Sequence, residues 1–132
     1  MNLLLDTHIY LWWAATPGRL KPKTHRLIDH TENTVFVSVV VLWEMLIKRQ
    51  KGKLEFEDEV LRPDLAFDFQ VLPIELKHLD SYSDLPLVHK DPFDRIMLAQ
   101  AIAEGLTFVT HDSRCLQYAR PNLLLQDASA GH

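Results

Sequence analysis

Short apolar runs alternate along this chain with segments of helical spacing, and this alternation limits the folds that the chain can adopt. Buried strands are predicted at 3–5, 35–37, 70–73, 107–110 and 123–125. Helices are predicted at 8–15, 22–32, 39–48, within 57–69, and at 75–83, 92–104 and 113–119. Strands that alternate with helices predict a parallel sheet with both faces covered. We therefore expect an α/β fold with a mostly parallel central sheet.

The length of 132 residues corresponds to one domain, which we expect to span 1–132 with a tail at 126–132. The only cysteine, Cys115, cannot form an internal disulfide and has no neighbour in the sequence that would activate its thiol. No apolar run is long enough to cross a membrane. The N-terminal residues lack the basic segment of a signal peptide. These features predict a cytoplasmic protein that does not bind membranes.

The charge balance is acidic, which bears on the partners that the chain can bind. There are 14 Lys and Arg residues against 18 Asp and Glu residues, a formal net charge of −4. A domain that binds nucleic acid through charge alone is normally basic. Either nucleic acid is not the partner, or the surplus acids lie together and are neutralised by bound cations.

Three acids, Asp6, Asp94 and Asp112, follow predicted strands or begin a predicted helix. In an open parallel sheet, ligands bind beyond the carboxyl ends of the strands. Each Asp taken alone also has a purely structural explanation, because Asp is a favoured helix cap. For Asp112 and Asp6 this capping role is the simpler interpretation.

Two acids, Glu44 and Asp94, are harder to explain as structural residues. Glu44 lies in the middle of a predicted helix beside its apolar face, where the alternative is an exposed pair with Lys48. Asp94 begins the apolar stripe of the helix at 92–104, so it is expected to be partly buried.

Convergence of these four carboxylates would require cations, because two charges about 5 Å apart repel by roughly 3 kcal/mol at an effective dielectric of about 20. Oxygen donors favour Mg²⁺ or Mn²⁺ over zinc. Such a pocket is suited to phosphodiester hydrolysis, in which the metal activates a water and stabilises charge on the phosphoryl oxygens. It would also account for the acidic charge balance.

The segments around these acids resemble the PIN-domain ribonucleases, most closely the VapC-like toxins of type II toxin–antitoxin pairs. The resemblance extends to about Leu125 and rests on Leu-Leu-Leu-Asp6-Thr-His, Ser38-Val-Val-Val-Leu-Trp-Glu44, His89-Lys-Asp-Pro-Phe-Asp94-Arg and Phe108-Val-Thr110-His-Asp112. It implies a three-layer α/β/α sandwich and an acidic pocket that binds Mg²⁺ or Mn²⁺. It also implies endonucleolytic cleavage of RNA, often of a structured RNA such as tRNA. A cognate antitoxin with a segment that occupies the pocket, and commonly a toxin homodimer, are implied as well.

Carried over by position, the resemblance implies that the catalytic and metal-binding set is Asp6, Glu44, Asp94 and Asp112. Possible accessory residues are Asp91, Thr110, Arg95 and Lys48. Asp91 is first a helix cap, and Arg95 either pairs with a pocket acid or contacts phosphate. Lys48 belongs to a basic cluster with Arg49, Lys51 and Lys53 that is either a solvated face or a phosphate-contacting rim.

The sequence leaves two alternatives to a nuclease, a phosphatase and a binding module, and it disfavours a structural zinc. The seven histidines show no metal-ligand spacing, so no structural zinc is expected. A phosphatase with Asp6 as nucleophile usually needs a second acid two residues later, where this chain has His8. The remaining alternative is a non-catalytic module with the same fold that binds RNA or protein, although such a scaffold has no use for four converging carboxylates.

Overall fold

A computed structural model describes residues 1–118 and 124–128, and in this part of the chain a five-stranded sheet forms the centre of the fold. Its strands are β1 (Asn2–Leu5), β2 (Thr34–Ser38), β3 (Gln70–Leu72), β4 (Thr107–Thr110) and β5 (Leu124–Asp127). The strand order is β3-β2-β1-β4-β5, and every neighbouring pair is parallel. The prediction of an α/β fold with a parallel sheet is confirmed.

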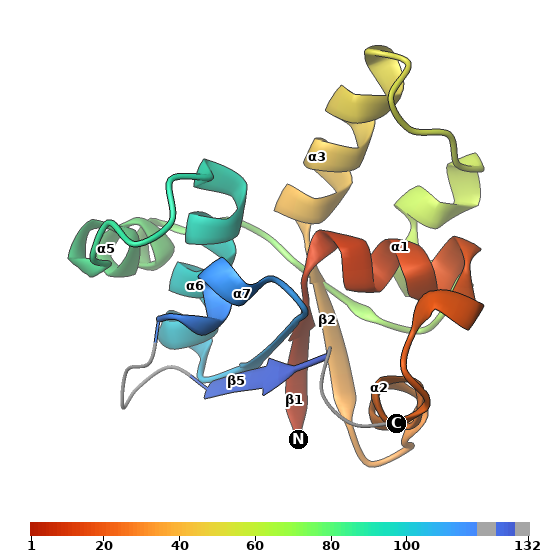
Figure 1. Cartoon of the computed structure of the whole chain (residues 1–132), viewed down its shortest axis with the longest axis horizontal. Coiled ribbons are helices and arrows are strands. Elements are labelled where there is room, and N and C mark those ends of the chain that lie inside the picture. The colour runs from red at the N-terminus through yellow and green to blue at the C-terminus, as the bar shows by residue number, and fades with distance from the viewer. Residues whose placement is uncertain (119–123, 129–132) are drawn as a thin grey trace.

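Helices cover both faces of the sheet, which gives the three layers of an α/β/α sandwich (Figure 1). Among the described residues, the α-helices are α1 (Thr7–Ala15), α2 (Pro22–Asp29), α3 (Val39–Gln50), α4 (Pro63–Ala66), α5 (Leu76–Asp84), α6 (Pro92–Glu104) and α7 (Ser113–Leu116). Helices α1 and α2 lie on one side of β1 and β2, and α5 and α6 lie on the other (Figure 1). Two 3₁₀ turns are η1 (Pro17–Arg19) and η2 (Asp58–Leu61).

Local signals in the sequence place the two helices that matter most for the site. The Ser38 hydroxyl accepts a hydrogen bond from the backbone N–H of Val40 and starts α3 directly after β2. Asp91 caps α6, Pro92 occupies its first turn, and Gly105 ends it with a left-handed φ of 67°. Glu44 and Asp94 therefore project from helices whose starting points are fixed by their caps.

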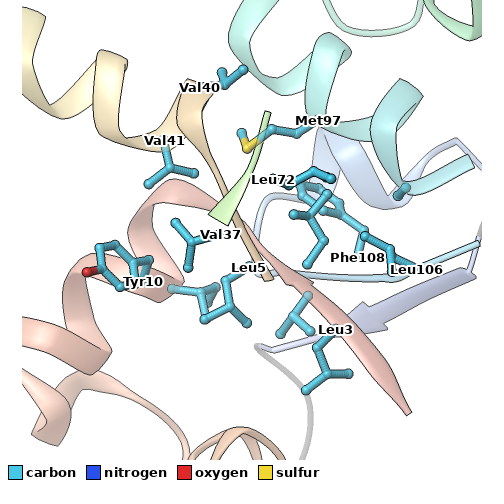
Figure 2. Close-up of a cluster of buried hydrophobic side chains, with 14 of the residues drawn as sticks. Leu3, Leu5, Tyr10, Val37, Val40, Val41, Leu72, Met97, Leu106 and Phe108 are labelled. Atoms are coloured by element: carbon cyan, nitrogen blue, oxygen red, sulfur yellow. The ribbon is translucent and has the colours of Figure 1, made fainter. Parts of the chain in front are cut away.

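The core lies on both faces of the central strand β1, whose Leu3, Leu4 and Leu5 are fully buried. Figure 2 shows side chains from β1 beside Val37 of β2 and Phe108 of β4. Burying one such side chain contributes about 1.5–3 kcal/mol, so the strand that carries Asp6 is anchored by its own apolar residues.

The order of the strands creates a switch point at the carboxyl end of β1. The chain adds β2 and then β3 on one side of β1, and it returns to add β4 and β5 on the other. Leu5 pairs with Val109 in register, so β1 and β4 end beside each other. Ligands of open α/β sheets bind at such a point, and the residues that follow these two strands include Asp6 and Asp112.

Several predicted boundaries are wrong. The helix predicted at 22–32 ends at Asp29. The helix predicted within 57–69 is present as the short α4, and η2 precedes it. Helix α7 ends at Leu116. Strand β5 includes Gln126 and Asp127, which were assigned to the tail. Predictions for 119–123 and 129–132 lie outside the described residues.

The segment after β5 begins in contact with the fold. Ala128 is buried, and its N–H donates to the backbone carbonyl of Thr110. Residues 126–128, which the sequence places in the tail, are therefore part of the fold. Across residues 1–118 and 124–128, no helix combines the length and apolar character needed to cross a membrane.

Candidate active site

Asp6 occupies the turn between β1 and α1 and is 3% exposed. Its carboxylate accepts hydrogen bonds from the backbone N–H of Thr7 at 2.6 Å and from the hydroxyl of Thr110 at 2.6 Å. Burial raises the pKa of Asp6 above its ordinary value even though both hydrogen bonds lower it. The predicted capping role is thus present, and a second bond from β4 fixes the same carboxylate in the crevice.

Glu44 lies in the middle of α3 and is 9% exposed. Lys48 Nζ lies 3.0 Å from Glu44 Oε2, so the helical pair considered from the sequence does form. The other carboxylate oxygen of Glu44, Oε1, accepts a hydrogen bond from the Thr7 hydroxyl at 2.7 Å. Since the side chain is buried and held by a different element, it is not an exposed surface pair.

Asp94 sits in the first turn of α6 and contacts His89, which precedes the helix. His89 Nε2 and Asp94 Oδ2 are 2.7 Å apart and form a hydrogen bond. Burial, followed by the negative charge of Asp6, raises the pKa of Asp94 to about 7. This carboxyl therefore takes up a proton readily unless a cation neutralises it.

Asp112 follows β4 and caps α7. Its N–H donates to the hydroxyl of Thr110, and its carboxylate accepts from the N–H of Arg114 at 2.8 Å. Burial acts to raise the pKa of Asp112, but this hydrogen bond and the Arg114 guanidinium outweigh it, so the pKa lies below its ordinary value. Asp112 is thus more readily ionised than Asp6 or Asp94.

The four carboxylates that the sequence singled out line one small cleft of about 100 Å³. Two of them follow β1 and β4, and the other two project from α3 and α6. Thr110 links two of them, because its hydroxyl donates to Asp6 and accepts from the N–H of Asp112. Lining residues of the cleft are Asp6, Thr7, His8, Glu44, Lys48, Asp91, Asp94, Asp112 and Arg114.

The donor set of this cleft fits a hard divalent cation. Its lining offers carboxylate oxygens from separate elements, and the two cations beside them, Lys48 and Arg114, each pair with only one acid of the cleft. Carboxylate oxygens are the ligands that Mg²⁺ and Mn²⁺ prefer. His89, Asp94, Asp112 and Cys115 also bring one ligand atom each within 4.8 Å of one another, so the described residues include a cluster that could hold a metal.

Three of the four predicted accessory residues, Asp91, Thr110 and Lys48, lie at the cleft or beside it. Asp91 Oδ1 accepts from the N–H groups of Phe93 and Asp94, and this is the helix cap predicted for it. Lys48 lines the cleft through its pair with Glu44. The neighbouring Arg49 instead pairs with Asp58, and Lys51 and Lys53 are exposed.

The prediction for Arg95 is wrong. Its guanidinium is buried, lies over the ring of Tyr82, and donates to the carbonyls of Pro86 and His89. It also donates to the hydroxyl of Tyr118. Arg95 pairs with no pocket acid and is turned away from the cleft, because its partners are the carbonyls of the segment before α6.

Sequence reasoning missed Thr7, His8, His89 and Arg114. Thr7 and His8 adjoin Asp6, but helical spacing does not distinguish their side chains from those of ordinary surface residues. His89 lies five residues before Asp94 in a segment without regular structure, so no periodicity predicts the contact. The one available signal was that His89 belongs to the same PIN-like motif as Asp94.

Comparison with known proteins assigns the fold and the sequence to one family. The sequence matches the PIN domain over residues 3–121, which is most of the chain. The chain belongs to the PIN-domain family. This PIN domain is 28% identical over 123 residues to ribonuclease VapC22 of Mycobacterium tuberculosis, with 91% of this chain and 94% of the relative covered.

Solved structures confirm the PIN fold. VapBC2 from Rickettsia felis, bound to a DNA fragment from its promoter, matches with a TM-score of 0.75 at 20% identity, and 96% of this chain and 98% of that chain are covered. DNA-bound VapBC from Salmonella typhimurium matches with a TM-score of 0.67 at 18% identity over the same shares of the two chains. The predicted resemblance to VapC-like PIN domains is therefore confirmed.

Proposed function

We propose that this PIN domain is a metal-dependent endoribonuclease and the toxin of a toxin–antitoxin pair. The observation that carries the proposal is the convergence of four carboxylates from four elements on one cleft at the switch point of the sheet. The name of its relative, ribonuclease VapC22, supports nuclease activity. RNA is the substrate class, with structured RNA such as tRNA as the first candidate, and the site of action is the cytoplasm.

Asp6, Glu44, Asp94 and Asp112 would hold Mg²⁺ or Mn²⁺. When bound, such an ion supplies an activated water and stabilises the charge that develops on the phosphoryl oxygens. Two threonines orient the donors, because Thr110 donates to Asp6 and Thr7 donates to Glu44. Since these carboxylates are held by hydrogen bonds from rigid elements, little reorganisation is needed when the ion binds.

The RNA backbone would be bound by two basic side chains at the cleft, Lys48 and Arg114. Lys48 and Arg114 contact different members of the acidic set, Glu44 and Asp112, and both side chains are accessible at the cleft. A phosphodiester between them would form an ion pair with the Lys48 ammonium and accept two hydrogen bonds from the planar Arg114 guanidinium. This arrangement supports phosphate binding by an acidic protein without a large basic surface.

An antitoxin is the proposed partner at the groove between α1, η2 and α4. The groove has a volume of about 560 Å³ and combines an apolar floor with a rim of Glu55, Glu57 and Glu59. A basic amphipathic segment would bury its apolar face there and pair its charges with the rim. The matching solved structures are VapBC complexes, which supports a protein partner of this kind.

A second copy of the chain is the proposed partner at a different groove, between α3, α5 and α6. Its volume is about 270 Å³, and it is lined by Val40, Trp43, Ile74, Leu79, Tyr82, Pro92, Phe93 and Ile96. Two copies that each carry a formal charge of −4 repel, so they associate best through a surface that lacks carboxylates. This groove meets that condition, whereas the glutamate-rimmed groove does not.

The test is cleavage of a mixed RNA substrate by purified protein free of antitoxin, with Mn²⁺, with Mg²⁺ and with EDTA. We expect cleavage with either ion, none with EDTA, and none by Asp94→Asn. Asp58→Asn is the matched control, because Asp58 is an exposed acid that pairs with Arg49 away from the cleft. Absence of cleavage by folded protein under every condition, together with no Mn²⁺ binding by calorimetry, would favour a non-catalytic module.

A further inference from the structure

Two buried side chains with metal-ligating atoms, His89 and Cys115, lie close to Asp94 and Asp112 and have no role in the proposed hydrolysis. Cys115 lies on α7 three residues after Asp112, so the two residues share one face of the helix. Its side chain is fully buried, and it makes no hydrogen bond with any described residue. His89 is buried as well, with Nε2 at 2.7 Å from Asp94 and 4.0 Å from Asp112.

These donors and two of the cleft carboxylates form a compact group of mixed chemistry. One ligand atom each from His89, Asp94, Asp112 and Cys115 lies within 4.8 Å of all the others. Donors around a tetrahedral zinc are separated by roughly 3.3–3.8 Å, as follows from bonds of about 2.0 Å to nitrogen and about 2.3 Å to sulfur. Side-chain rotations that bring the atoms about 1 Å closer are therefore enough to complete such a site.

We propose that His89, Asp94, Asp112 and Cys115 form a Zn²⁺ site that opens into the cleft through its two aspartates. Thiolate and imidazole donors select zinc over Mg²⁺ and Mn²⁺, which bind oxygen. Zinc would replace the proton of the His89–Asp94 hydrogen bond and the proton of the thiol, and both protons would pass to solvent. The sequence shows no ligand spacing for this set, because α6, α7 and the segment before α6 bring its members together.

The surroundings of Cys115 disfavour the other roles of a thiol. Burial, together with the charges of Asp94, Asp6 and Asp112, raises the pKa of the thiol well above its ordinary value. Such a thiol is a poor nucleophile and reacts slowly with oxidants. A bound divalent cation reverses this electrostatic penalty, since it compensates the carboxylates and the thiolate together.

Glu75, His78 and Glu104 form a second cluster, which differs from the proposed zinc site in its partners and its chemistry. His78 Nδ1 accepts from the N–H of Glu75, so its Nε2–H donates to Glu104, and both ring nitrogens are occupied. Lys77 also contacts both glutamates, at 3.4 Å and 2.8 Å. This cluster already has a lysine on its two carboxylates and contains no sulfur, and it therefore provides the matched control.

Occupation of the zinc site has a functional consequence that rests on the proposed function. Asp94 and Asp112 belong to both donor sets, so Zn²⁺ at the mixed site withdraws them from a magnesium or manganese ion in the cleft. We expect Zn²⁺ to inhibit RNA cleavage that is supported by Mn²⁺, and Cys115→Ser to relieve this inhibition.

The decisive experiment uses Co²⁺ as a spectroscopic substitute for Zn²⁺ on the full chain and needs no nuclease activity. Wild-type protein should develop the near-ultraviolet band of thiolate-to-cobalt charge transfer, and equimolar Zn²⁺ should remove it. Cys115→Ser should lack the band and bind Zn²⁺ at least about tenfold more weakly. His78→Gln should keep both the band and the affinity.

Folding of each variant is checked by thermal melting, and Cys115→Ala replaces the serine variant if the latter does not fold. No charge-transfer band in folded wild-type protein overturns the proposal without any variant. Equal Zn²⁺ affinity of wild type and Cys115→Ser or Cys115→Ala also overturns it. A band accompanied by no RNA cleavage under any condition supports the zinc site and contradicts the nuclease instead.

Discussion

At the scale of single residues, Asp94 makes the stability of the metal-free protein depend on pH. Its pKa is about 7 in the folded chain, against an ordinary value of 3.8. Between these values the folded state binds a proton that the unfolded state has lost, so the contribution of Asp94 to the free energy of unfolding falls as pH rises. Asn is neutral in both states. As the pH rises from about 5 to about 8, the free energy of unfolding of Asp94→Asn should therefore increase by about 1–2 kcal/mol relative to that of wild type.

Urea unfolding in EDTA at the two pH values measures this difference. Asp58→Asn should show no such change, because Asp58 is an exposed residue outside the cleft. Parallel stability curves for Asp94→Asn and wild type would contradict the assignment of a raised pKa to this carboxyl.

At the scale of elements, Arg95 of α6 holds the segment before α6 that contains His89. Its guanidinium donates to carbonyls of Pro86 and His89 and to the hydroxyl of Tyr118. A lysine keeps the charge but cannot present donors in a planar fork, so buried carbonyls lose partners. Arg95→Lys should lower the free energy of unfolding by about 1–3 kcal/mol.

The matched control is Arg62→Lys, in which an exposed arginine that pairs with Asp64 undergoes the same substitution. Its cost should be below about 0.5 kcal/mol, as is usual for surface ion pairs. Equal losses in the two variants, measured by denaturant unfolding, would show that the buried network of Arg95 contributes nothing particular.

The elements that could be predicted are those with local signals. Ser38, Asp91, Pro92 and Gly105 mark where α3 and α6 begin or end, and these boundaries depend on neighbours along the chain. A helix within 57–69 was predicted and α4 lies there, but its bounds were not, because no capping residue marks the ends of such a short helix. The orientation of Arg95 depends on Tyr118, 23 residues away, and no local pattern reports such a contact.

The candidate site could be located for a different reason. The acids follow strands, and parallel strands end at one edge of the sheet, so topology alone brings Asp6 and Asp112 together. Which side chains hold them is a matter of geometry across elements. The hydrogen bonds from Thr110 to Asp6 and from Thr7 to Glu44 join residues 104 and 37 positions apart. Local sequence patterns therefore could not predict these contacts.

At the scale of the whole molecule, the two grooves differ in charge, and this difference predicts how copies of the chain assemble. Trp43 is 56% exposed in the groove between α3, α5 and α6, where it packs edge-on against Phe93. A glutamate there would bring a charge to the centre of a dimer interface, with a copy of itself from the partner nearby. Trp43→Glu should convert the proposed dimer to a monomer at micromolar concentration, as measured by sedimentation or light scattering.

Leu65→Glu is the control, because Leu65 is 73% exposed and lies outside this groove, so that variant should remain dimeric. A monomeric wild type, or a Trp43→Glu protein that still forms dimers, would assign the apolar groove to another partner.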